Sequence, residues 1–114
     1  MLRSGRAFLY ESLDNAWRVV NAERALSLEQ LAMLWLASTQ AATAAKEAAE
    51  LVFSAGGSAS PYESGGLERC VRDIHAAAQH LVRAAGNYQM AGQALLGMDM
   101  RATPLLFMDD RSAA

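Results

Sequence analysis

An all-α fold, arranged as a four-helix up-down bundle, is the architecture that this sequence predicts. Apolar residues recur at helical spacing in each long segment, and alanine and leucine dominate the composition. Only two prolines occur in 114 residues. Glycines interrupt the pattern at Gly56, Gly57 and Gly97, where helices are expected to end. We therefore predict one helical domain over residues 1–97, followed by an extended C-terminal tail over residues 98–114.

The composition limits the kinds of partner. Hydrophobic residues make up 53% of the chain and charged residues 19%, which favours burial of part of the surface against another protein. A net charge of −2 argues against nucleic acid, which selects basic patches. The single cysteine is consistent with a reducing cytoplasm, and no apolar run is long enough to cross a membrane. We expect a cytoplasmic homo-oligomer, either a dimer or a tetramer.

The first helix is expected from Arg3 to Asn21. Ser27 then has the position of an N-cap, and Gln30, three residues later, completes a capping box. On the first helix, an apolar stripe at helical spacing is expected to form the inner face. It consists of Leu9, Leu13, Ala16, Trp17 and Val20.

The second helix is expected from Leu28 to Ala55. Its early part, Leu31–Ala37, is apolar on all sides, which predicts burial on most sides. Its later part carries a stripe that is expected to face solvent, made of Thr39, Thr43, Lys46, Glu47 and Glu50. Gly56 is the expected left-handed C-cap. The glycine pair Gly56 and Gly57 could let a ligand approach the backbone, although a plain cap and linker is the simpler interpretation from spacing alone.

The third helix, from Leu67 to Val82, carries the densest chemistry in the chain. Its segment LERCVRDIHAAAQH holds both histidines and the only cysteine. Helical spacing places His75 away from the face that contains His80. That face consists of Arg69, Arg72, Asp73, Ala76, Ala77 and His80.

Metal binding and thiol catalysis are not favoured by this segment. Cys70, His75 and His80 stand at i, i+5 and i+10 and do not share a helical face, so they would not converge on one ion. Cys70 and His75 diverge in the same way, which argues against a nucleophile and base pair. A fourth helix is expected from Ala84 to Leu96, with Gly97 as its stop.

Together these segments resemble the C-terminal helical domain of the acyl-CoA dehydrogenase superfamily. The resemblance rests on the Gly-Gly pair in the loop, on LERCVRDIHAAAQH and on NYQMAGQALLG, and it spans Arg6–Gly97. In particular, the chain is similar to the flavin-dependent monooxygenases that hydroxylate aromatic substrates or oxidise sulfur heterocycles. Two positions depart from the pattern: Gly66 stands where that family usually has proline, and Ala84–Ala85 stand where it often has Ser-Pro.

The resemblance implies roles for individual residues. His80 matches the family's histidine near the flavin ring and is the candidate catalytic residue. Gly56, Gly57 and Arg72 are the candidate cofactor-binding residues, because the family's glycine-rich loop lies along the diphosphate–adenosine side of the flavin. Asp73 and His75 are candidates for substrate binding or support. The simpler interpretation is a structural ion pair for Arg72 and Asp73, and a solvated or interface histidine for His75.

Two function classes follow. The first is the C-terminal domain or a fragment of a flavin-dependent oxidoreductase, inactive alone, that contributes oligomer contacts and His80. The resemblance implies FAD or FMN in the complete enzyme, with none bound tightly by this chain alone and with a flavin-binding chain as a further partner. Family enzymes have an N-terminal helical domain and a middle β-domain that supply most of the flavin and substrate pocket. The alternative is a free-standing, non-catalytic helical association module derived from that domain.

Overall fold

The computed structural model describes residues 1–59, 66–81 and 84–100, and within these ranges every regular element is helical. The all-α class is therefore confirmed. The bounds agree with the predicted ones to within one residue at every described end, while Val82 lies outside the described residues. Helix α1 spans Leu2–Asn21, α2 spans Leu28–Ala55, α3 spans Leu67–Leu81 and α4 spans Ala84–Leu95, and a short 3-10 turn, η1, covers Gly57–Ala59.

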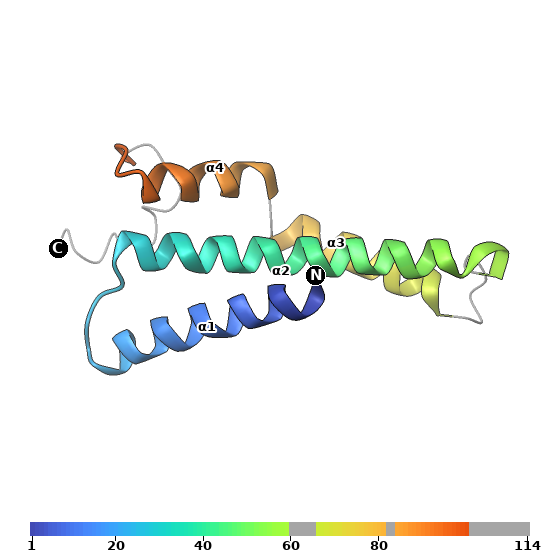
Figure 1. The fold of residues 1–114 in the computed structure, drawn as a ribbon, viewed down its shortest axis with the longest axis horizontal. Coiled ribbons are helices and arrows are strands. Elements are labelled where there is room, and N and C mark those ends of the chain that lie inside the picture. The colour runs from blue at the N-terminus through green and yellow to red at the C-terminus, as the bar shows by residue number, and fades with distance from the viewer. Residues whose placement is uncertain (60–65, 82–83, 101–114) are drawn as a thin grey trace.

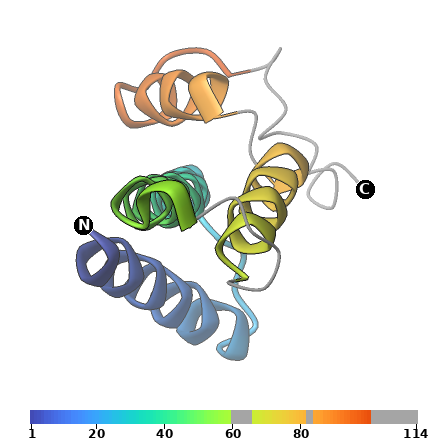
Figure 2. The same cartoon turned by 90° about the vertical axis from the view of Figure 1, so that its right-hand side faces the viewer.

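Helix α2 is the axis of the bundle, because α1, α3 and α4 each pack against it (Figure 1). Helices α1 and α4 flank its N-terminal half, and α3 lies along its C-terminal half. Viewed from the end, α1, α3 and α4 surround α2 on different sides (Figure 2). A helix of 28 residues is about 42 Å long, which gives α2 room for two partners in succession.

The predicted capping box at the start of α2 is present. The Ser27 hydroxyl accepts a hydrogen bond from the Gln30 backbone N–H at 3.1 Å. The Gln30 side chain accepts one from the Ser27 backbone N–H at 2.9 Å. Such a cap contributes about 1 kcal/mol, and it fixes the residue at which the longest helix begins.

The inner face of α1 differs from the predicted stripe. Its buried residues are the small ones, Gly5, Ser12 and Ala16. A Cβ atom added at Gly5 would lie 3.4 Å from the Cβ of Ala44, so the two backbones approach closely. Of the predicted stripe only Ala16 is buried and Leu9 is half-buried, whereas Leu13, Trp17 and Val20 are exposed.

The early part of α2 is largely buried, in agreement with the prediction. Leu31, Ala32 and Ala37 are buried, and the four residues between the last two are half-buried. Helix α4 packs here through small residues, and Met100, after α4, returns to the same cluster with 4% exposure. The cluster consists of Ala32, Ala91, Ala94 and Met100, with Leu28, Trp35, Leu36 and Met90 packed against it.

The left-handed residue after α2 is Gly57, not Gly56 as predicted. Gly56 has φ −69° and its backbone N–H still donates to Val52 O at 3.0 Å, so it continues the helical geometry. Gly57 has φ +57°, a conformation that favours glycine. At the other predicted stop, Gly97 has φ +71° and the Met98 N–H donates to Gln93 O, which closes α4 as a Schellman motif.

Residues 98–100, the start of the predicted tail, have no helical structure, and residues 101–114 lie outside the described part of the chain. None of the helices in the described ranges has both the length and the apolar character needed to cross a membrane.

Gly5 should control the spacing of α1 and α2. Gly5→Leu should lower the free energy of unfolding by about 1–3 kcal/mol, because its side chain would meet the backbone of Ala41 and the side chain of Ala44. The matched control is Gly92→Leu on α4, where an added Cβ meets nothing within 4 Å and the change should be neutral or stabilising. Urea unfolding followed by circular dichroism measures both, and equal effects would contradict this packing.

Candidate functional site

Helix α3 has two faces of different character. Its inner residues, Val71, Ile74, His75 and Ala78, are half-buried and follow the i, i+3, i+4, i+7 spacing of one face. The described residues of the predicted motif face, Arg69, Arg72, Asp73, Ala76 and Ala77, are all exposed, and Ala77 also borders the pocket described below. His80 belongs to the helical backbone of α3, and its side chain lies outside the described part of the structure.

Arg72 and Asp73 lie together on the exposed face. The Arg72 guanidinium is 3.5 Å from the Glu68 carboxylate and 4.0 Å from that of Asp73. The side chains of Arg72 and Asp73 are 63% and 67% exposed, so these pairs contribute little to stability. The carboxylates of Glu68 and Asp73, both on α3, thus orient the Arg72 guanidinium. The guanidinium is still accessible to solvent, so an anionic ligand could reach it.

His75 lies on the inner side of α3, away from the exposed face that carries Arg72 and Asp73. Its Nε2 atom is 2.9 Å from Glu50 Oε1 on α2, and the same oxygen is 4.0 Å from Lys46 Nζ. The contact joins two helices that are far apart in the sequence. His75 is therefore a residue of the interface between α2 and α3. Its partner Glu50 belongs to the stripe of α2 that was expected to face solvent.

The two glycines lie where α2 ends, away from the contacts just described. Both are exposed, and no atom lies within 4 Å of a Cβ built on Gly57. The backbone there is open enough for a ligand to approach. Residues 60–65, in the loop that follows η1, lie outside the described residues.

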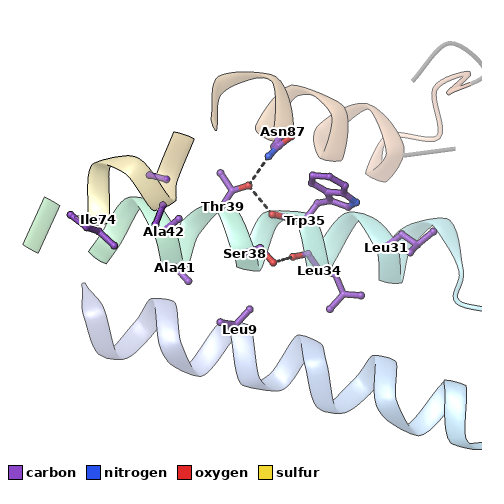
Figure 3. Close-up of a pocket in the computed structure, with 12 residues that line it drawn as sticks. Leu9, Leu31, Leu34, Trp35, Ser38, Thr39, Ala41, Ala42, Ile74 and Asn87 are labelled. Carbon is purple, nitrogen blue, oxygen red and sulfur yellow. Dashed lines mark hydrogen bonds between the residues drawn. The ribbon is translucent and has the colours of Figure 1, made fainter. Parts of the chain in front are cut away.

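A pocket that was not predicted opens between the four helices. Its volume is about 550 Å³, in the range of small-molecule sites. Trp35 forms part of its wall, and α3 contributes Ile74 (Figure 3). The polar residues of the lining are Ser38, Thr39 and Asn87. The full lining consists of Leu9, Leu31, Leu34, Trp35, Ser38, Thr39, Ala41, Ala42, Ile74, Ala77, Ala78 and Asn87.

A buried hydrogen-bond chain joins α2 to α4 at the wall of this pocket (Figure 3). Thr39 is 0% exposed, and its hydroxyl donates to Trp35 O at 2.8 Å. The Thr39 hydroxyl oxygen in turn accepts a hydrogen bond from Asn87 Nδ2 at 3.2 Å. On the adjacent exposed side, the Tyr88 hydroxyl donates to Gln40 Oε1 at 2.8 Å.

The prediction that Thr39 faces solvent was therefore wrong. Helix α4 covers it, and its hydrogen bonds compensate for the lost contact with water. A weak signal was present in the sequence, since Thr39 and Asn87 are short polar residues in helices that are rich in alanine. Their pairing across 48 positions could not be read from that signal.

The described residues offer no group of three His, Cys, Asp or Glu side chains that could hold a metal ion. Cys70 is exposed and its thiol is free. For a flavin, the described residues provide the exposed Arg72 for a phosphate and the open backbone at Gly57. Each of these groups is open to solvent, and neither would enclose such a cofactor.

Comparison with known proteins relates the chain to a known family and to a characterised enzyme. The family described as acyl-CoA dehydrogenase, C-terminal domain, matches residues 1–84. Indole-3-acetate monooxygenase of Pseudomonas putida is 38% identical over 96 residues, which cover 84% of this chain and 25% of that protein. The chain thus spans about a quarter of that relative's length. No solved structure matches the chain.

Thr39 should be more important for stability than its exposed neighbour. Thr39→Val should lower the free energy of unfolding by about 1–3 kcal/mol, because it leaves the buried Asn87 amide without its acceptor. Ser38→Ala is the control, since Ser38 makes a similar bond to Leu34 O on an exposed site and should change stability by about 0.5 kcal/mol or less. In urea unfolding, Thr39→Val combined with Asn87→Leu should recover part of the loss. If Thr39→Val were as mild as Ser38→Ala, the buried bond would not be formed.

Proposed function

We propose a function from the premise that this chain belongs to the acyl-CoA dehydrogenase C-terminal domain family, which matches residues 1–84. The proposed function is that of the C-terminal helical domain of a flavin-dependent oxidoreductase of the monooxygenase type. The observation that carries it is the 38% identity to indole-3-acetate monooxygenase across 84% of the chain. Because the match covers 25% of that protein, the activity would belong to an assembled enzyme and not to this domain alone.

The exposed face of α3 is the part of this chain that would meet the flavin. Arg72 is free to contact a phosphate, and the small side chains of Ala76 and Ala77 keep the adjacent surface low. Helical spacing assigns His80 to the same face. The flavin, FAD or FMN, would supply the redox chemistry. Gly56 and Gly57 would lie along its diphosphate–adenosine side, where the open backbone at Gly57 allows a close approach.

His80 is the proposed catalytic residue of the assembled enzyme. A histidine can donate or accept a hydrogen bond and exchanges protons near neutral pH, so it can orient a substrate oxygen and move a proton there. Asp73 would support this face through its contact with Arg72. His75 would act more remotely, because its contact with Glu50 holds α3 against α2.

Members of this family are oligomers. We propose that this chain likewise self-associates, as a dimer or a tetramer, and that a flavin-binding chain is its second partner. The low charged fraction of 19% supports burial of part of its surface. The free thiol of Cys70 supports a location in the reducing cytoplasm.

A non-catalytic association module is the second candidate. It is favoured by one observation: the candidate cofactor-binding residues Gly56, Gly57 and Arg72 are all exposed, and the described residues around them provide no enclosure for a cofactor. A neighbouring reading frame that encodes the N-terminal helical and β-domains would favour the oxidoreductase. Purification of this chain from its native source without any flavoprotein would favour the module.

The isolated chain should bind flavin weakly. One helix face and one open loop leave most of the cofactor in water, so the dissociation constants for FAD and FMN should both be weaker than about 10 μM. Isothermal titration calorimetry with each flavin is the measurement. A dissociation constant of about 10 μM or tighter for either flavin would contradict this expectation.

His80 and His75 should differ in an assembled enzyme. This chain would replace the matched quarter of indole-3-acetate monooxygenase, and product and hydrogen peroxide would be measured together. His80→Ala should lower the rate of oxygenation by about a hundredfold or more and release more peroxide, because a proton-transfer group is lost. His75→Ala should change the rate far less.

The flavin absorbance spectrum shows whether each variant of the chimera still binds its cofactor. A larger loss of rate with His75→Ala, or full coupling with His80→Ala, would contradict the assigned roles. A chimera that binds flavin and responds to neither substitution would favour the association module.

A further inference from the structure

An apolar stripe runs along the outer side of α1. Tyr10, Leu13, Trp17 and Val20 are 54%, 47%, 66% and 50% exposed. They follow the i, i+3, i+7, i+10 spacing of one helical face, so they form one continuous surface about 15 Å long. Single exposed apolar residues are common on protein surfaces. Four large apolar residues that are neighbours on one helical face indicate a surface that another protein covers.

The packing of α1 on α2 explains why these large residues face outward. The inner face uses Gly5, Ser12 and Ala16, and small residues allow the two helices to approach closely. The stripe lies about a quarter turn or more around the helix from that face. No rearrangement within the pair of α1 and α2 can cover it while Gly5 remains against Ala44.

We propose that a second copy of this chain covers the stripe, with two α1 helices paired antiparallel about a two-fold axis near residue 15. The stripe is complementary to itself in this arrangement. Positions that sum to 30 lie opposite each other, so Tyr10 meets Val20 of the second copy and Leu13 meets Trp17 of the second copy. Each pair therefore combines an aromatic ring with a smaller aliphatic side chain, and an isologous interface requires this kind of self-matching.

The charges beside the stripe support the antiparallel direction. Asp14 and Arg18 lie on the same flank of α1, and both are exposed. In the proposed register, Arg18 of one copy lies opposite Ser12 of the other. Asp14 is two residues from Ser12, so Asp14 and Arg18 of different copies are offset by only about 3 Å along the helix axis. The two-fold axis forms this opposite-charge approach twice. A parallel pairing about a two-fold axis would instead place the Asp14 flanks of the two copies on opposite sides of the interface, so Asp14 would not approach Arg18 of the other copy.

The area is sufficient for a specific interface. The exposed parts of the four side chains amount to roughly 450 Å² in each copy, given about 150–250 Å² for large side chains. Apolar atoms contribute about 60% of the area of a typical interface. An interface whose apolar part is the roughly 450 Å² of this stripe would therefore bury about 750 Å² per partner in total. Standard interfaces bury about 800 Å² per partner.

This inference refines the self-association proposed above, and its test does not involve flavin. Sedimentation equilibrium of the 114-residue chain between about 1 and 100 μM should show a reversible dimer. Leu13→Glu should weaken the dimer at least a hundredfold, because it places two carboxylates in the apolar contact. Leu51→Glu, on an equally apolar residue of α2 that is 65% exposed, is the matched control and should leave the dissociation constant unchanged.

Trp17→Lys provides a second variant that should also yield monomers, and circular dichroism checks that each variant keeps its helical content. A wild-type chain that stays monomeric throughout the range would overturn the proposal and leave the stripe to a different partner, such as a flavin-binding chain. Dimers that survive both substitutions, or that Leu51→Glu disrupts equally, would also overturn it.

Charge reversal tests the register separately. Asp14→Arg and Arg18→Asp should each weaken the dimer severalfold, and the double variant should restore it, because opposite charges then face each other again. If the double variant associates no better than the single ones, the antiparallel register is wrong. None of these outcomes bears on His80, so a failure here is distinguishable from a failure of the proposed oxidoreductase.

Discussion

The structure depends on the burial of α2 by three other helices. Its early segment is apolar on all sides, so any face left in water would expose large side chains. Helix α1 covers one side through small residues, α4 covers another through Ala91 and Ala94, and α3 lies along the C-terminal half. Each of these three helices uses one face to contact α2. The opposite face of each helix is therefore available to other molecules.

Polar contacts determine how the partners are positioned along α2. Apolar packing of alanines is tolerant of sliding, since small side chains fit one another at several offsets. Thr39 and Asn87 form a buried bond at one position only, which selects the register of α4. On the other half, His75 and Glu50 form the equivalent contact between α3 and α2, at a more exposed site where it is worth less.

The two surfaces proposed to act on other molecules follow from this arrangement. Helix α3 turns Val71, Ile74 and Ala78 inward, so the face with Arg72 and Asp73 points outward and is accessible to the proposed flavin-bearing partner. Helix α1 turns Gly5 and Ala16 inward, so its large apolar residues are left for a second copy. In the proposed function, a domain organised in this way gains its chemistry by assembly.

The sequence by itself determined the features that arise from neighbouring residues: the helix bounds, the capping box at Ser27, the stop at Gly97 and the separation of His75 from the Arg72 face of α3. Local hydrogen bonding and helical periodicity are sufficient for these. Only the tertiary structure decided which side of α1 is inner, because close approach at Gly5 prevailed over the burial of larger residues such as Trp17. It also decided the burial of Thr39, whose partner is 48 positions away and is brought near only when α4 packs on α2.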